Sequence, residues 1–134
     1  MRKKLLRPIA LSLLWLCFGL SCKKEEVAAS CDPSECCGSF KYTLKQTLEG
    51  IPVDLLGTRS LVFEKPFEGR PSLPACINQW KMLEPYERTT YLDDPKPPLK
   101  YKVWGKIYHN MEVWNIGKPY ELYEVYIERI EKVN

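Results

Sequence analysis

Four cysteines carry the clearest chemical signal in this chain, and their spacing favours disulfide formation. Cys31, Cys36 and Cys37 lie close together, whereas Cys76 stands about 40 residues away. Four cysteines allow three pairings. A bond between the adjacent Cys36 and Cys37 would strain the backbone, so we expect Cys31 to pair with one of them and Cys76 with the other. The sequence leaves open which of the two takes which partner.

The same four thiols make a poor zinc site. Structural zinc sites usually draw their ligands from pairs of closely spaced cysteines. Here four residues separate Cys31 from Cys36, which is wide for such a pair, and Cys76 has no second thiol nearby. The Cys-x-x-Cys spacing of redox motifs does not occur either. We therefore predict two disulfides, no metal ion and no cofactor.

Residue types that could catalyse a reaction are sparse. His109 is the sole histidine, and it stands beside Asn110 where we expect a hairpin turn. The Gly-x-Ser-x-Gly motif of serine hydrolases and the glycine-rich loops that bind nucleotides are both absent. Asp93 and Asp94 form a carboxylate pair, but their proline-rich surroundings favour a solvated loop. We therefore predict that the protein is not an enzyme and assign no catalytic residue.

Aromatic side chains are the better candidates for function. Trp104 and Tyr108 fall on the lysine-rich face of a predicted strand, and Trp114 follows shortly after. Exposed aromatic rings on a sheet can stack on a sugar or insert into a protein partner. These three residues form the candidate binding surface for a protein or carbohydrate partner. The alternative is that they only pack the core or the exterior of a small barrel.

The N-terminal segment, residues 1–21, has the pattern of an export signal. Its first residues are rich in cations from Arg2 to Arg7, and an apolar run follows from Ile9 to Leu20. As a helix this run would span roughly 18 Å, which is short of the ~30 Å hydrocarbon core of a bilayer. We therefore expect a cleaved signal peptide and not a permanent transmembrane helix.

Gly19-Leu20-Ser21-Cys22 ends the apolar run and resembles the lipobox of bacterial lipoproteins, in which a small residue precedes an invariant cysteine. The resemblance implies a diacylglycerol on Cys22, cleavage before it and acylation of the new amine. Several acyl chains hold a protein stably on a membrane. The alternative is ordinary secretion, with Cys22 as a spare thiol.

No Asp follows Cys22, and the next residues, Lys23-Lys24-Glu25-Glu26, are similar to the surface-export tag of some outer-membrane lipoproteins. The resemblance therefore implies a lipid-anchored protein of the outer membrane. Its periplasmic or surface face stays open. We expect residues 22–30 to form a flexible, lipidated tether.

The charge distribution argues against a nucleic-acid partner. The chain has 20 Lys and Arg, 17 Asp and Glu and a formal net charge of +3. Four of the cations lie in the leader, so 16 Lys and Arg face 17 Asp and Glu from Cys22 onward. A basic surface for phosphates is therefore not expected. The chain's 134 residues suffice for one domain, which we place at residues 31–134.

Alternating apolar and polar residues predict strands in this domain. Clear alternation runs from Phe40 to Leu48 and from Leu99 to Tyr108, and Gly105 within the second run indicates a bulge. Shorter candidates are Ser60–Glu64 and Met111–Ile116. The last segment, Tyr120–Val133, also fits a helical stripe, but its Tyr, Val and Ile residues favour a strand.

Glycine and proline predict where these strands end. Gly50 and Pro52 are expected to break the chain after the first strand. Seven prolines lie in residues 66–98, so this stretch should be mostly irregular apart from a short element at residues 76–83. Five or six strands with many turns predict a mainly β domain, a small antiparallel barrel or sandwich stabilised by disulfides.

Two weaker resemblances concern the C-terminal half. A strand with Val103, Gly105 and Ile107, followed by a strand that ends in Ile130-Glu131-Lys132-Val133, is similar to small lipoproteins with an OB-like barrel. This resemblance implies a fold more than an activity. Gly105-Lys106-Ile107-Tyr108 together with Trp114–Gly117 is faintly similar to lipoprotein inhibitors of C-type lysozyme, although Trp104 stands where that family has a serine. The sequence thus favours a non-catalytic binding or interaction module, with an inhibitor of an envelope-attacking enzyme such as lysozyme as the alternative.

Overall fold

The computed structural model describes residues 26–29, 31–38, 41–90, 97–110, 114–115, 118–119 and 122–133. The leader, Cys22, the pair Asp93 and Asp94, and residues 111–113 lie outside these described residues. None of the described helices is long and apolar enough to cross a membrane.

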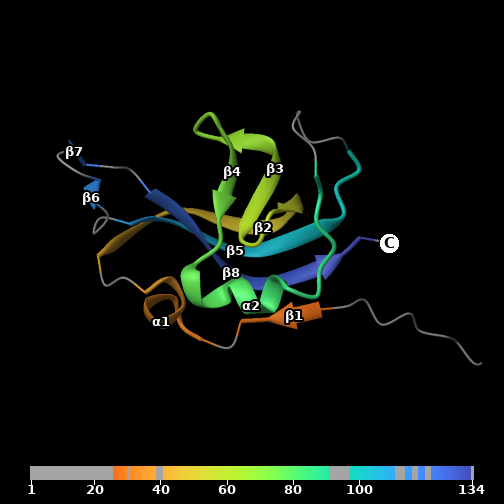
Figure 1. Ribbon diagram of the computed structural model, residues 1–134, viewed down its shortest axis with the longest axis horizontal. Coiled ribbons are helices and arrows are strands. Elements are labelled where there is room, and N and C mark those ends of the chain that lie inside the picture. The colour runs from red at the N-terminus through yellow and green to blue at the C-terminus, as the bar shows by residue number, and fades with distance from the viewer. Residues whose placement is uncertain are drawn as a thin grey trace, which may run out of the picture.

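Six antiparallel strands form one curled sheet in the order β1-β8-β5-β2-β3-β4 (Figure 1). Their bounds are β1 Glu26–Ala28, β2 Tyr42–Leu56, β3 Ser60–Phe67, β4 Arg70–Pro74, β5 Tyr101–Asn110 and β8 Leu122–Lys132. A separate small hairpin joins β6, Trp114–Asn115, to β7, Lys118–Pro119. The helical elements are short: α1 Pro33–Cys37, η1 Ile77–Gln79 and α2 Trp80–Leu83. The predicted mainly β, antiparallel fold is confirmed.

The sheet closes on itself to form a partly open barrel. After β4 the chain returns to β8, where Ala75 and Val125 form an isolated parallel bridge. The N–H of Cys76 donates to the carbonyl of Val125 at 2.9 Å. In the sequence, η1 and α2 come after β4 and before β5. A partly open barrel of five main strands agrees with the OB-like fold that the sequence resemblance implies.

Strand β2 is long and contains a bulge, so that its two parts have different partners. Its first part pairs with β5, and Val53–Leu56 pairs with β3. Gly50 adopts a φ of +62° at a register shift of the β2–β5 ladder. The expectation that Gly50 and Pro52 end the strand is wrong, because the backbone bulges there and then continues. Glycine suits this position because a positive φ is strained for other residues.

The bulge predicted at Gly105 is present, but its extra residue, Glu128, lies opposite on β8, because Trp104 pairs with Arg129 and Gly105 with Ile127. The β5–β8 ladder shifts register between Trp104 and Gly105. A Cβ atom at position 105 would lie 2.1 Å from the carbonyl oxygen of Tyr126, so a side chain does not fit. The neighbouring core is closely packed, and its fully buried side chains include Val53, Leu61, Leu83, Val103, Val125, Ile127 and Ile130.

The proline-rich stretch is more ordered than the sequence predicts. Strand β3 runs on to Phe67, and β4 carries Pro71 and Pro74. Because β4 is the last strand of the sheet, one of its edges needs no ladder partner and tolerates proline. The expected short element at residues 76–83 is confirmed as η1 and α2, and the C-terminal segment is a strand, β8.

The folded domain begins earlier than the sequence predicts. The expectation of a flexible tether up to residue 30 is wrong for β1, whose residues pair with β8 in the register Glu26 to Glu131 and Ala28 to Arg129. Ala29 continues this contact, because its N–H donates to the carbonyl of Glu128 at 2.9 Å. Residues 26–29 are therefore part of the sheet in this structure.

Two disulfides fasten the α1 segment to the barrel. Cys31 pairs with Cys36, and Cys37 pairs with Cys76, which settles the choice that the sequence left open. Asp32 caps α1, since its Oδ1 accepts hydrogen bonds from the N–H groups of Ser34 and Glu35, the second and third residues of the helix. In the loop-entropy model the longer closure contributes roughly 3–4 kcal/mol to stability.

The outer edge of β8 receives hydrogen bonds from three separate segments. Cys76 donates to Val125, and Ala29 with β1 covers the part of the edge beyond Ile127. Between them the buried amide of Gln79 takes the place of a strand. Its Nε2 donates to the carbonyl of Ile127 at 2.7 Å, and its Oε1 accepts from the N–H of Ile127 at 2.7 Å. This side chain satisfies both backbone groups of a fully buried residue.

Replacement of Gln79 by Leu should destabilise the domain by about 2–4 kcal/mol, because it leaves a buried N–H and a buried C=O without partners. The measurement is denaturant unfolding with both disulfides intact. Lys81→Ala on the exposed face of α2 is the control and should change stability by less than about 0.5 kcal/mol. Equal stability of the two variants would contradict the proposed role of Gln79.

Candidate functional site

The three aromatic residues singled out by sequence do not form one surface. Trp104 is half-buried in β5 and lines a cleft. Tyr108, four residues further along the same strand, is only 8% exposed. Trp114 lies in β6, and its side chain is outside the described part of the chain. The expectation that Tyr108 shares an exposed face with Trp104 is therefore wrong.

Tyr108 is buried because the disulfide-bonded segment covers its end of the sheet. Its ring packs on Tyr42 with centroids 4.6 Å apart. Cys36, Cys37 and Cys76 belong to the same buried cluster. Burial raises the pKa of the Tyr108 hydroxyl above its ordinary value. This ring is a packing residue and is not available to a ligand.

A buried polar pair lies beyond Tyr108 on the same strands. Asn110 Nδ2 donates to Glu124 Oε2 at 2.8 Å, and both residues are less than 9% exposed. Burial raises the pKa of the Glu124 carboxyl, and the hydrogen bond from Asn110 offsets part of that rise. The sequence gives little sign of this pair, because an acid between Tyr123 and Val125 is what a solvent-facing strand position would carry.

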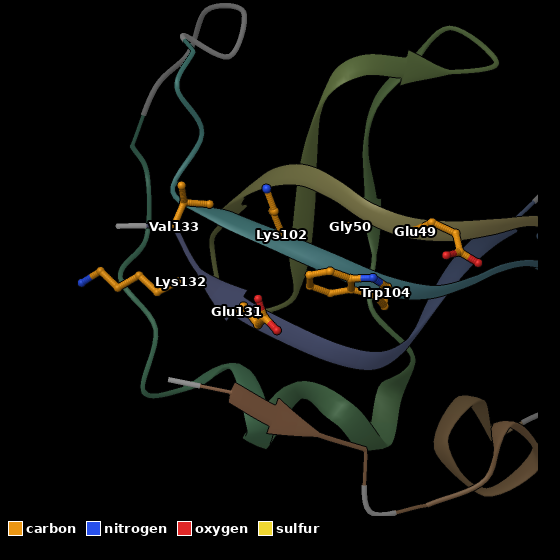
Figure 2. A pocket seen from close by; sticks show the side chains of 7 residues that line it. All are labelled: Glu49, Gly50, Lys102, Trp104, Glu131, Lys132 and Val133. Atoms are coloured by element: carbon orange, nitrogen blue, oxygen red, sulfur yellow. The ribbon is translucent and has the colours of Figure 1, made fainter. Parts of the chain in front are cut away.

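At the other end of this face the sheet is open, and Trp104 lies in a shallow cleft of about 480 Å³. The lining residues come from β2, β5 and the end of the chain: Glu49, Gly50, Lys102, Trp104, Glu131, Lys132 and Val133. Figure 2 shows Glu49, Lys102 and Glu131 around the indole, whereas Lys132 points away from it. The cleft thus has an aromatic floor and polar groups on three sides.

Two neighbours hold the indole in place. Arg129 lies opposite Trp104 on β8, and its guanidinium carbon is 3.8 Å from the ring centroid. Glu131 in turn contacts the guanidinium of Arg129 at 3.3 Å. A Cβ atom on Gly50 would lie 3.0 Å from the ring carbon Cζ2, so the bulge of β2 provides the space that the ring occupies. Cation–π stacking and this close fit fix the orientation of the ring before any ligand arrives.

Charges around the cleft are balanced. Two carboxylates, Glu49 and Glu131, stand against the ammonium groups of Lys102 and Lys132. Outside the cleft, Lys106 and Glu128 form an ion pair at 3.2 Å, which raises the pKa of Lys106. A surface of this kind has no strong preference for an anion or a cation. It suits a neutral polar partner that offers a flat apolar face and several hydrogen-bonding groups.

Groups that could perform catalysis are not assembled here. His109 lies in β5 and not in the predicted turn, and its ring stacks on Tyr123 with centroids 5.0 Å apart. Across the described residues, no group of three or more His, Cys, Asp or Glu side chains could hold a metal ion. The segment that is similar to lysozyme inhibitors, Gly105–Tyr108, lies within β5, where only Lys106 among its residues is not buried.

Sequence reasoning identified Trp104 but missed the residues that position it. Gly50 was recognisable as a glycine within an alternating pattern, yet its contact partner lies 54 residues away on another strand. Arg129 faces Trp104 only because of the register of the β5–β8 ladder after the Gly105 bulge. Registers of this kind are not visible in a single sequence.

Substitution of Gly50 by Ala should cost more stability than the same substitution at Gly57. Both glycines have a positive φ, near +60°, so each variant should lose roughly 1–2 kcal/mol through backbone strain. Only at Gly50 does the new methyl group also meet the Trp104 ring. Unfolding curves should therefore show the larger loss for Gly50→Ala, together with a shift in tryptophan emission. Identical losses would show that the ring does not depend on Gly50.

Substitution of Glu124 by Gln should flatten the dependence of stability on pH. The folded state raises the pKa of Glu124, so its contribution to stability is fully present below the unfolded pKa of about 4.3. That contribution is lost as the pH rises through the folded pKa. The Gln variant should therefore match the wild type near pH 4 and exceed its stability at neutral pH. Lower stability of the variant at neutral pH would contradict this assignment.

Comparison of the chain with models of protein families, with curated proteins and with solved structures finds no match. Function is therefore inferred from the cleft and from the residues of the sequence.

Proposed function

We propose that this chain is a lipid-anchored protein of the bacterial outer membrane that binds a partner, without catalysis, through the Trp104 cleft. The observation that carries this proposal is the fixed indole at the floor of a charge-balanced cleft. The partner class is a protein or a carbohydrate, since both can place a flat apolar surface on an aromatic ring.

Preorganisation supports a binding role for Trp104. An anchor that already has its bound orientation loses little side-chain entropy on association. Tryptophan and arginine are also the residue types that contribute most to binding energy at interfaces. Trp104 and Arg129 stand together on adjacent strands, with the polar groups of Glu49 and Lys102 beside them.

The anchor is supported by the N-terminal sequence. The lipobox-like Ser21-Cys22 follows an apolar run, and Glu26, the first residue of β1, is the fourth residue after Cys22. A chain of that length spans at most about 14 Å. Glu26 pairs with Glu131, which lines the cleft. A lipid on Cys22 would therefore keep the cleft close to the membrane surface.

Intact-protein mass spectrometry tests the anchor. The chain is produced in a Gram-negative host and weighed with and without reduction of its disulfides. We expect a mature chain that begins at Cys22 and carries acyl groups, with a gain of four protons on reduction because two disulfides open. A Cys22→Ser variant should carry no acyl mass. An unmodified wild-type chain would refute the lipid anchor and leave the binding role to be judged separately.

Substitution of Trp104 by Ala tests the binding role. Chemical cross-linking on intact cells of the native host is followed by mass spectrometry of the products. We expect the Trp104→Ala chain to keep its cooperative unfolding and to lose a cross-linked partner that the wild type and Lys81→Ala both retain. A folded Trp104→Ala chain with an unchanged set of partners would refute the cleft as the binding site.

A further inference from the structure

The N-terminal part of strand β2, before Val53, has a free edge. Its residues up to Val53 pair with β5 on one side, but β3 joins the other side only from Val53 onward. Within the described part of the chain, no strand pairs with that side between Thr43 and Pro52. Five consecutive residues, from Thr43 to Thr47, are exposed. The backbone groups of this edge therefore point into solvent.

A groove follows the free edge because β3 diverges from β2 beyond Phe63. One lobe of about 440 Å³ lies between Lys45 and Gln46 on β2 and residues 65–68 on β3. A second lobe of about 430 Å³ adjoins it, since Gln46 and Lys65 line both lobes. The two lobes together have the size of a peptide-binding groove.

Core side chains form the floor of this groove. Ile107 lines the first lobe but is only 1% exposed, so it lies beneath the groove and supports its floor. Ile51 and Phe67 line the two lobes and are partly buried against the same core. The floor is therefore apolar, whereas the walls are two strand edges.

The two walls differ in what they offer. Pro66 on β3 has no N–H group, so that wall cannot supply a regular ladder. The facing part of β2, residues 43–49, contains no proline. Its ladder with β5 shifts register between Leu44 and Gln46, and from Gln46 to Leu48 it presents the N–H and C=O of every second residue. An incoming chain can therefore pair with β2 alone and rest its side chains on the floor.

Two lysines of the groove stand without an ion-pair partner in the described part of the chain. Lys45 and Lys65 have no ion-pair partner among the described residues, whereas Glu68 is paired with Arg70 at 3.7 Å. The lining of the lobes also holds two carboxylates, Glu64 and Glu68, of which Glu68 is the one paired with Arg70. A partner that places a carboxylate between Lys45 and Lys65 would complete the charge balance.

We infer that this groove binds an extended polypeptide segment of another protein, which pairs with the free edge of β2 as an added strand. The segment presents apolar side chains to the floor and an acidic side chain to Lys45 and Lys65. Strand addition explains why an open edge coexists with an accessible apolar floor. This site is separate from the Trp104 cleft and does not depend on the function proposed for it.

A display library of linear peptides, selected on the full chain in detergent micelles, tests the inference. We expect enrichment of peptides that alternate apolar residues and contain an acidic residue. N-methylation of the best peptide at successive positions should weaken binding roughly tenfold at every second position only, because only alternate N–H groups face β2. Hydrogen exchange should slow at amides between Thr43 and Glu49 when this peptide binds.

Charge reversal provides the matched comparison. Lys45→Glu and Lys65→Glu should each weaken binding of the acidic peptide, whereas Lys81→Glu on the exposed face of α2 should not. Absence of any enriched linear peptide would overturn the inference. So would binding that tolerates N-methylation at all positions, or protection of amides elsewhere than on β2.

Discussion

The outer edge of β8 is the constraint on which the rest of this structure depends. A strand edge buried against other segments needs a partner for each N–H and C=O group, because an unpaired buried group costs about 1–3 kcal/mol. No single strand covers this edge. Cys76 forms a hydrogen bond with Val125 at one end of the edge, and β1 and Ala29 form hydrogen bonds at the other end. Between them, the side chain of Gln79 forms hydrogen bonds with the N–H and C=O of Ile127. The disulfide from Cys37 to Cys76 holds the α1 segment beside these contacts. These short segments are ordered because they form hydrogen bonds with the backbone groups of the β8 edge.

The same covering segment decides where a ligand can reach the sheet. It lies over the end of the β5–β8 face that holds Tyr108, where Tyr126 donates from its hydroxyl to the carbonyl of Cys31 at 2.8 Å. It does not extend to Trp104, so the cleft begins where the cover ends. Two aromatic residues on one face of one strand therefore have different roles. Alternation along β5 assigns them to the same face correctly, but burial depends on what packs over that face.

Local sequence patterns predict the structural features that depend on neighbouring residues. They fail for features that depend on contacts with distant segments. Alternation predicted β5, and the preference of Tyr, Val and Ile for strands predicted β8. The register shift at Gly105 followed from a glycine within an alternating run. Cysteine spacing narrowed the disulfides to two patterns because adjacent cysteines are poorly placed to bond. The strand at Glu26–Ala28 was missed because three residues, Glu-Val-Ala, are too short to show a pattern and are paired only along the edge of β8. Gln79 was missed for the same reason, since a polar residue in a short helix is ordinarily exposed.

Gly50 connects the two surfaces that could bind partners. Its bulge gives the Trp104 ring the space it needs on one face of the sheet. The same bulge separates the part of β2 that pairs with β5 alone from the part that also pairs with β3. In the register of the β2–β3 ladder, Val53 pairs with Phe63 and β3 ends at Phe67, so β3 could not cover the part of β2 before Glu49. Edge strands are usually blunted by proline, by charge or by a cover. Here Pro66 blunts the β3 wall, while the β2 wall beside Gly50 keeps its backbone groups free. The β2 edge carries a bulge and Lys45 but no covering strand among the described residues, and an edge of this kind beside an apolar groove suits the addition of a strand.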